Sequence, residues 1–239
     1  MEIICYLSNG YPSLEQSYQM AIEYADAGCN IIEVDFPSRN PYLESDYIAT
    51  RMKKALQCCD DYAEYMNSIV KIKEKLPNVK LLVLAYENTV EEIGVEKFIQ
   101  FCLEHDLKDI LLVGLSDDKV KNKILDAGLC VSCYIQFHMP EEEIGRAKNS
   151  NGFVYMQAKP YEDQEINEQY PTLKDCIAYL RKLGITRPIY CGVGVHKPED
   201  ISLVKEAGGD AAFVGSTILK LQENIPEMKE MIQKFKNMC

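Results

Sequence analysis

The chain has 239 residues, of which 47% are hydrophobic and 26% are charged. This balance is typical of a folded globular protein and excludes a disordered chain, and the length suits one α/β barrel domain. The formal net charge of -11 opposes binding to the phosphate backbone of nucleic acids, which requires clustered Lys and Arg. We therefore expect no nucleic-acid partner.

The sequence carries no sign of membrane insertion or export. No apolar stretch reaches the roughly 18 residues of a membrane span, and Met1 to Cys5 lack the basic start of a signal peptide. The 10 cysteines are scattered, several of them within apolar runs, which is typical of small core residues rather than of a disulfide framework. We expect a cytoplasmic protein without membrane contact.

Short β-rich runs alternate with helical patterns along the whole chain. This alternation implies parallel strands, and eight such units predict a (β/α)₈ TIM barrel. No Gly/Ser linker or charge block divides the chain, so a single domain over residues 1–239 is expected. The predicted strands are Ile3 to Leu7, Asn30 to Val34, Lys80 to Ala85, Asp109 to Val113, Cys130 to Ile135, Gly152 to Met156, Pro188 to Cys191 and Ala211 to Val214.

Several helices between these strands have recognisable ends. Ser13 to Gln16 resembles a capping box, and Gly28 follows Ala27 where a helix commonly ends. Pro198 to Asp200 suits the first turn of a later helix, which Gly208-Gly209 would end.

Glu33 ends the second predicted strand and is followed by the Pro-bounded loop Asp35 to Pro41. The carboxyl ends of barrel strands carry the catalytic groups of such enzymes, which makes Glu33 a candidate catalytic residue. The alternative is an ordinary solvated acid at a strand end.

Glycines follow the seventh and eighth predicted strands, in the run Cys191 to Pro198 and at Gly215-Ser216. Their backbone N–H groups can approach a phosphate closely, and barrels often bind phosphate there. An open doubly wound sheet would instead place its glycine motif after the first strand, where Ser8 to Pro12 contain no such motif. The alternative is that these glycines only turn the chain; His196 and Lys197 are candidate charge partners.

These features, taken in chain order, resemble the alpha subunit of tryptophan synthase. The similarity extends from about Ile3 to Leu221 and rests on several motifs in matching order and spacing. The motifs are Gly10 to Gln16, Ala27 to Glu33, the loop Pro37 to Pro41, Tyr86 to Asn88, Gly94 to Phe98, Gly192 to Gly194 and Gly215-Ser216.

The resemblance implies a lyase that cleaves indole-3-glycerol phosphate into indole and glyceraldehyde 3-phosphate by a retro-aldol step. It assigns acid/base catalysis to Glu33 and the second carboxylate to Glu44, or to Asp46 if the loop shifts. It implies no metal or organic cofactor, and a tryptophan synthase beta subunit as a possible partner. The matched positions are Tyr6, Leu84, Tyr86 and Tyr155 in the substrate pocket and Gly194, Gly215 and Ser216 for the phosphate, with core or mouth packing as the alternative for the first four.

Three departures from the family pattern bear on this reading. Asp35 replaces a glycine and should face the same side as Glu33, where a second carboxylate would raise the proton affinity of one of the two. Gly114-Leu115-Ser116 replaces an Asp-Leu-Pro run, and Gln157 to Gln164 replaces a Gly- and Thr-containing lid, with Lys159 as a candidate phosphate partner. A related barrel enzyme on another sugar phosphate and a noncatalytic phosphate-binding or regulatory paralogue therefore stay open.

Overall fold

The computed structural model describes residues 1–114 and 118–239, so that Leu115 and Ser116 of the altered run lie outside the described residues. The chain divides into two compact units, one of residues 6–131 and one of residues 1–5 with 132–239. Strand β1 (Glu2–Leu7) contributes residues to both units. Each unit is described by itself.

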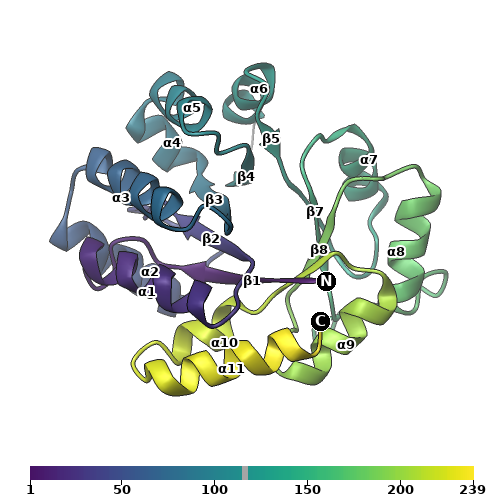
Figure 1. The fold of residues 1–239 in the computed structure, drawn as a ribbon. Helices are drawn as coiled ribbons and strands as arrows, with labels where there is room; N and C mark the ends of the chain where they lie inside the picture. Colours follow the sequence, from purple (N-terminus) through teal and green to yellow (C-terminus); the bar gives the residue numbers. More distant parts are fainter. Residues whose placement is uncertain (115–117) are drawn as a thin grey trace. The chain divides into compact units, whose positions relative to one another are not determined.

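Residues 6–131 form a parallel sheet with helices along it (Figure 1). Strand β2 pairs with β3, β3 with β4, and β4 with β5, all in parallel. The strands are β2 (Ile31–Asp35), β3 (Lys80–Tyr86), β4 (Asp109–Val113) and β5 (Cys130–Val131). The helices are α1 (Leu14–Asp26), α2 (Asp46–Cys58), α3 (Tyr62–Lys75), α4 (Glu87–Ile93), α5 (Val95–Glu104) and α6 (Lys119–Asp126).

The other unit repeats this arrangement with the remaining strands (Figure 1). Glu2 to Ile4 of β1 pair with β9, β9 with β8, β8 with β7, and β7 with β6, again in parallel. The strands are β6 (Cys133–Ile135), β7 (Val154–Gln157), β8 (Ile189–Gly192) and β9 (Ala211–Phe213). The helices are α7 (Glu141–Asn149), α8 (Leu173–Lys182), α9 (Pro198–Ala207), α10 (Gly215–Lys220) and α11 (Ile225–Asn237).

The predicted strands are confirmed, with one difference at the fifth. The run Cys130 to Ile135 is interrupted at Ser132, so that its first part pairs with β4 and its second part with β7. The predicted helix ends are also confirmed: Ser13 Oγ accepts the Gln16 N–H at 3.2 Å, and Gly208 ends α9 with a φ of 89°. Within the described part of the chain, no helix combines the length and the apolar character needed to cross a bilayer.

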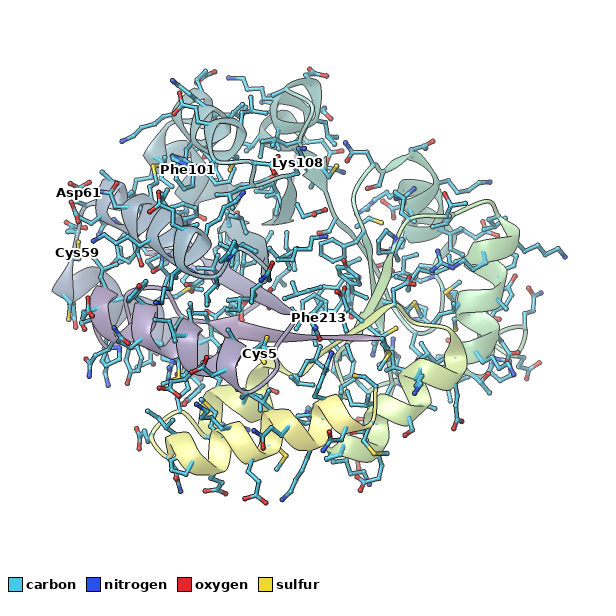
Figure 2. All side chains as sticks on the ribbon, in the orientation of Figure 1. Cys5, Cys59, Asp61, Phe101, Lys108 and Phe213 are labelled. Atoms are coloured by element: carbon cyan, nitrogen blue, oxygen red, sulfur yellow. The ribbon has the colours of Figure 1, made fainter. Side chains whose placement is uncertain are left out.

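The loop after β2 is held firmly at its base. Phe36 is fully buried, and its ring meets Phe98 and Phe101 edge-on at centroid distances of 5.7 Å and 6.0 Å; Figure 2 labels Phe101 on α5. Tyr62 Oη donates to the Pro37 carbonyl at 3.0 Å. These contacts fix the backbone that leaves the end of β2, and so constrain where the following loop can go.

Candidate functional site

One face of β2 and β3 carries the polar groups of the candidate site. Side chains alternate along a strand, so Glu33 and Asp35 share one face of β2. In the parallel register Glu33 lies beside Leu82 and Asp35 beside Leu84, which places Tyr86 next on the same face of β3. The structure thus brings Glu33, Asp35 and Tyr86 to one end of these two strands.

Glu33 is a buried acid whose proton is hard to remove. Its side chain is 8% exposed, and no hydrogen bond reaches its carboxyl group from residues 1–114 or 118–239. Burial raises the pKa of Glu33 to about 8, with further increases from the nearby charges of Glu44 and Asp35. Glu33 therefore carries a proton at neutral pH, and none of the described residues forms a hydrogen bond to its carboxyl oxygens.

Asp35 differs from Glu33 because both of its oxygens accept short hydrogen bonds. Tyr6 Oη donates to Oδ2 at 2.6 Å, and the backbone N–H of Asn9 donates to Oδ1 at 2.6 Å. Burial raises the pKa of Asp35 to about 7, while these two bonds and the charge of Arg51 oppose the increase. The two carboxyl groups on one strand face thus have different surroundings.

Glu44 joins this cluster from the loop that precedes α2. Its Oε1 accepts a hydrogen bond from Tyr86 Oη at 2.7 Å, and its negative charge raises the pKa of Glu33. The tip of this loop is strained and exposed, since Leu43 has a φ of 65° and is 83% exposed. Asp46 is instead the exposed first residue of α2. Of the two predicted alternatives, Glu44 is the one that contacts Tyr86 and lies near Glu33.

The glycine turn after β8 is packed closely against residues from β7 and the loop that follows it. A Cβ at residue 192 would lie 2.5 Å from the Tyr155 ring, and one at residue 194 would lie 2.7 Å from Lys159 Cβ. Gly194 also has a φ of 93°, a conformation that favours glycine. Glycine is therefore required at both positions because the Tyr155 and Lys159 side chains lie too close for a Cβ atom. A turn exposed on the surface would not impose this requirement.

The first turn of α9 is already occupied by a carboxylate of the protein. Asp200 is 5% exposed, and its Oδ2 accepts the backbone N–H groups of His196 at 2.8 Å and Lys197 at 3.1 Å. Lys159 Nζ pairs with Oδ1 of the same carboxylate at 2.5 Å. The backbone N–H groups of His196 and Lys197, which directly precede α9, and the Lys159 ammonium thus face Asp200, which leaves them poorly suited to a ligand phosphate.

The start of helix α10 differs from that of α9 in having no side-chain cap. Helix α10 begins at Gly215 and Ser216, and its N-cap residue Val214 makes no side-chain capping bond. Ser216 is exposed, so its hydroxyl is accessible. Thr217 Oγ1 donates to the His196 carbonyl at 3.2 Å, which ties this helix start to the turn after β8.

Tyr155 lies in the same unit as these glycine turns. Its ring stacks on Phe213 at a centroid distance of 4.4 Å and an angle of 19°; Phe213 is labelled in Figure 2. Tyr134 meets the same ring edge-on at 5.5 Å. The half-buried Tyr155 is thus fixed by aromatic neighbours rather than free to rotate.

Sequence reasoning missed two of the polar partners that shape these sites. Arg51, 6% exposed, donates from Nε to Ser8 Oγ at 3.2 Å, and a buried Arg on a helix has no motif that predicts it. Asp200 was expected only in the first turn of a helix. Its ion pair with Lys159 was missed because the two residues lie 41 positions apart in the sequence. Within the described residues, no group of three His, Cys, Asp or Glu side chains is arranged to hold a metal ion.

Comparison with solved structures gives the fold class. A protein of Aquifex aeolicus VF5 matches with a TM-score of 0.85 and 20% identity, over 99% of this chain and 92% of that one. The tryptophan synthase subunit alpha from Campylobacter jejuni matches with a TM-score of 0.80 and 20% identity, over 98% and 95% of the two chains. The fold class is the (β/α)₈ barrel that the strand and helix order predicts.

Sequence comparison gives the family. The chain is 25% identical to a tryptophan synthase alpha chain of Cyanidioschyzon merolae over 98% of both proteins. It is 23% identical to the tryptophan synthase alpha chain of Haemophilus influenzae strain Rd, over 94% of this chain and 88% of that one. A family model for the tryptophan synthase alpha chain matches residues 1–239. Since that match spans the whole sequence, the protein belongs to the tryptophan synthase alpha chain family.

Proposed function

We propose that the protein is an alpha-type lyase that cleaves indole-3-glycerol phosphate into indole and glyceraldehyde 3-phosphate, with Glu33 as the group that carries the proton. The observation that supports this most is the state of Glu33. A buried carboxyl group with a pKa of about 8 is protonated at neutral pH, and no hydrogen bond from the described residues occupies its oxygens. A general acid for neutral pH requires this combination.

The reaction uses one carboxyl group twice. Neutral Glu33 donates its proton to the ring carbon that bears the glycerol chain, which leaves positive charge on the ring nitrogen. The resulting Glu33 carboxylate then removes the proton from the hydroxyl group on the adjacent chain carbon. As that hydroxyl becomes an aldehyde, the carbon–carbon bond breaks, its electron pair restores the aromatic ring, and Glu33 is protonated again.

Glu44 is proposed to stabilise the positive charge on the ring. Its carboxylate is electrostatically coupled to Glu33, and its Oε1 is held by Tyr86. A negative charge fixed in place before the reaction stabilises charge that develops during the reaction. Tyr6 and Tyr86 are proposed to line the ring site with their rings. Their hydroxyl groups already donate hydrogen bonds, from Tyr6 to Asp35 and from Tyr86 to Glu44.

Gly194, Gly215 and Ser216 are proposed to bind the phosphate, and Tyr155 to contact the substrate. The support is that α10 lacks a side-chain cap, whereas the start of α9 is filled by Asp200. Backbone N–H groups at an open helix start suit a phosphate. Neither Lys159 nor Lys197 is needed in this assignment.

Membership of the family supports proposals on the partner, the domain organisation and the location of the protein. A solved relative from Pyrococcus furiosus, with a TM-score of 0.82 and 18% identity, is a tryptophan synthase complex. We propose that this chain likewise binds a beta subunit, that residues 1–239 form one domain, and that the protein is cytoplasmic.

The reaction is tested by incubating the purified protein with indole-3-glycerol phosphate, with and without a tryptophan synthase beta subunit. Indole and glyceraldehyde 3-phosphate are expected in equal amounts, measured by chromatography and by a coupled dehydrogenase assay. Substrate binding without either product, under both conditions, would instead favour a noncatalytic phosphate-binding protein.

Changing Gly194 to Ala is expected to raise KM for the phosphate substrate about tenfold, which corresponds to about 1.4 kcal/mol. The added Cβ would meet Lys159 and force the turn after β8 to move. Gly184→Ala is the matched control, since Gly184 has a φ of 86° but no atom within 4 Å of its Cβ position. Both variants suffer backbone strain, so an equal effect on KM would remove the turn after β8 from phosphate binding.

A further inference from the structure

Asp35 is a buried carboxyl group for which the proposed reaction has no role. It is fully buried and lies two residues beyond Glu33, which corresponds to about 6.6 Å along the strand. Two acids so close in a buried site cannot both ionise easily, because each negative charge disfavours the other.

A series of hydrogen-bond donors leads to Asp35, whereas none of the described residues donates a hydrogen bond to the carboxyl group of Glu33. Arg51 Nε donates to Ser8 Oγ at 3.2 Å, Ser8 Oγ to Tyr6 Oη at 3.5 Å, and Tyr6 Oη to Asp35 Oδ2 at 2.6 Å. The Asn9 N–H adds a second donor to Asp35 at 2.6 Å. The donor residues are 1% to 6% exposed, so water screens these bonds very little.

We propose that Asp35 is a positioning residue: Tyr6, Asn9 and Arg51 keep the negative charge of the carboxyl pair on Asp35, so that Glu33 holds its proton and begins the reaction as the acid. This inference rests on the proposed function of Glu33. It assigns a role to Tyr6 that differs from ring contact, because the Tyr6 hydroxyl group then acts through Asp35.

The surrounding charges support this division between the two acids. Burial raises the pKa of both, to about 7 for Asp35 and about 8 for Glu33. Glu44 raises both values, whereas hydrogen bonds and the positive Arg51 lower only that of Asp35. The other titratable neighbours, Tyr86 beside both acids and Tyr65 beside Asp35, have raised pKa values and stay neutral. The hydrogen bonds from Tyr6 and Asn9 and the positive charge of Arg51 thus favour the charged form of Asp35 and not that of Glu33.

The test is a carbon-13 NMR titration of the Glu33 carboxyl group in protein labelled at glutamate Cδ, with the signal assigned by its loss in Glu33→Gln. In Asp35→Asn the midpoint of Glu33 is expected to fall by about one pH unit, because a like charge is removed. In Tyr6→Phe the carboxylate form of Asp35 loses a hydrogen-bond donor, so Asp35 stays protonated to a higher pH. Glu33 then faces less negative charge and should begin to titrate at lower pH. The alkaline fall of kcat/KM for indole release should likewise move to lower pH in both Asp35→Asn and Tyr6→Phe.

Tyr24→Phe is the matched control. Tyr24 is also fully buried, and its hydroxyl group donates to the backbone carbonyl of Tyr6 at 3.0 Å rather than to a carboxylate. A midpoint for Glu33 that is unchanged or higher in both Asp35→Asn and Tyr6→Phe would overturn the proposal, as would an equal fall in Tyr24→Phe. If Asp35→Asn does not fold, Tyr6→Phe decides alone. The titration does not depend on turnover, so absent indole release would contradict the proposed function and leave this result interpretable.

Discussion

Replacing Glu33 with Gln is expected to lower kcat for indole formation by a factor of about 10² to 10⁴, the usual contribution of a general acid or base. Gln has nearly the same size and shape as neutral Glu but has no proton to donate to the ring carbon and cannot accept one from the hydroxyl group. The measurement is steady-state indole release. KM should change little, because Glu33 does not contact the phosphate in the proposed assignment.

The control for this prediction is Glu74→Gln, which makes the same chemical change at an exposed position on α3. It should retain the activity of the parent protein. Near-full activity in Glu33→Gln, with the circular dichroism spectrum unchanged, would exclude Glu33 from the proton transfers.

The same substitution is expected to stabilise the fold at alkaline pH. The pKa of Glu33 rises from 4.5 to about 8 on folding, so the folded state binds its proton more tightly than the unfolded state. The contribution of Glu33 to stability is therefore complete below pH 4.5 and is lost as the pH rises to about 8. Gln avoids this loss, and the gain in unfolding free energy should be on the order of 4 to 5 kcal/mol at pH 8.5 and close to zero at pH 4.5.

Urea unfolding at several pH values measures this effect, with a single cooperative transition expected for one domain. Glu74→Gln should change the unfolding free energy equally little at each pH. A difference between Glu33→Gln and the parent that does not grow with pH would show that Glu33 is ionised in the folded protein. A gain in stability with loss of activity is the usual relation between a strained functional group and the fold that holds it.

The strand and helix order was predictable from the sequence because it depends on local patterns. Apolar runs and end signals such as Ser13 and Gly208 act over a few residues, and the structure has them where they were predicted. The break of the fifth strand at Ser132 was not predictable, since all six residues from Cys130 to Ile135 suit a strand. The break is visible only from the pairing of β5 with β4 and of β6 with β7.

The polar contacts of the candidate site were predictable only in part. Strand alternation and family resemblance place Glu33, Asp35 and Tyr86 together, because their spacing along two paired strands is regular. The bond from Tyr6 to Asp35 and that from Lys159 to Asp200 depend on side-chain directions across distant segments, which periodicity does not encode. For Lys159 that difference changes its role, from a candidate phosphate ligand to the partner of an internal carboxylate.

The proposed reaction requires that Glu33 is a neutral acid when the substrate binds. The most direct test is the pH dependence of kcat/KM for indole release by the parent protein, since this ratio reports ionisations of the free enzyme. The predicted result is a fall in kcat/KM at alkaline pH with a midpoint of about 8. A kcat/KM value that stays constant or rises between about pH 7 and pH 9 would show that the reaction does not begin with a proton held by a group of this pKa, and would contradict the account.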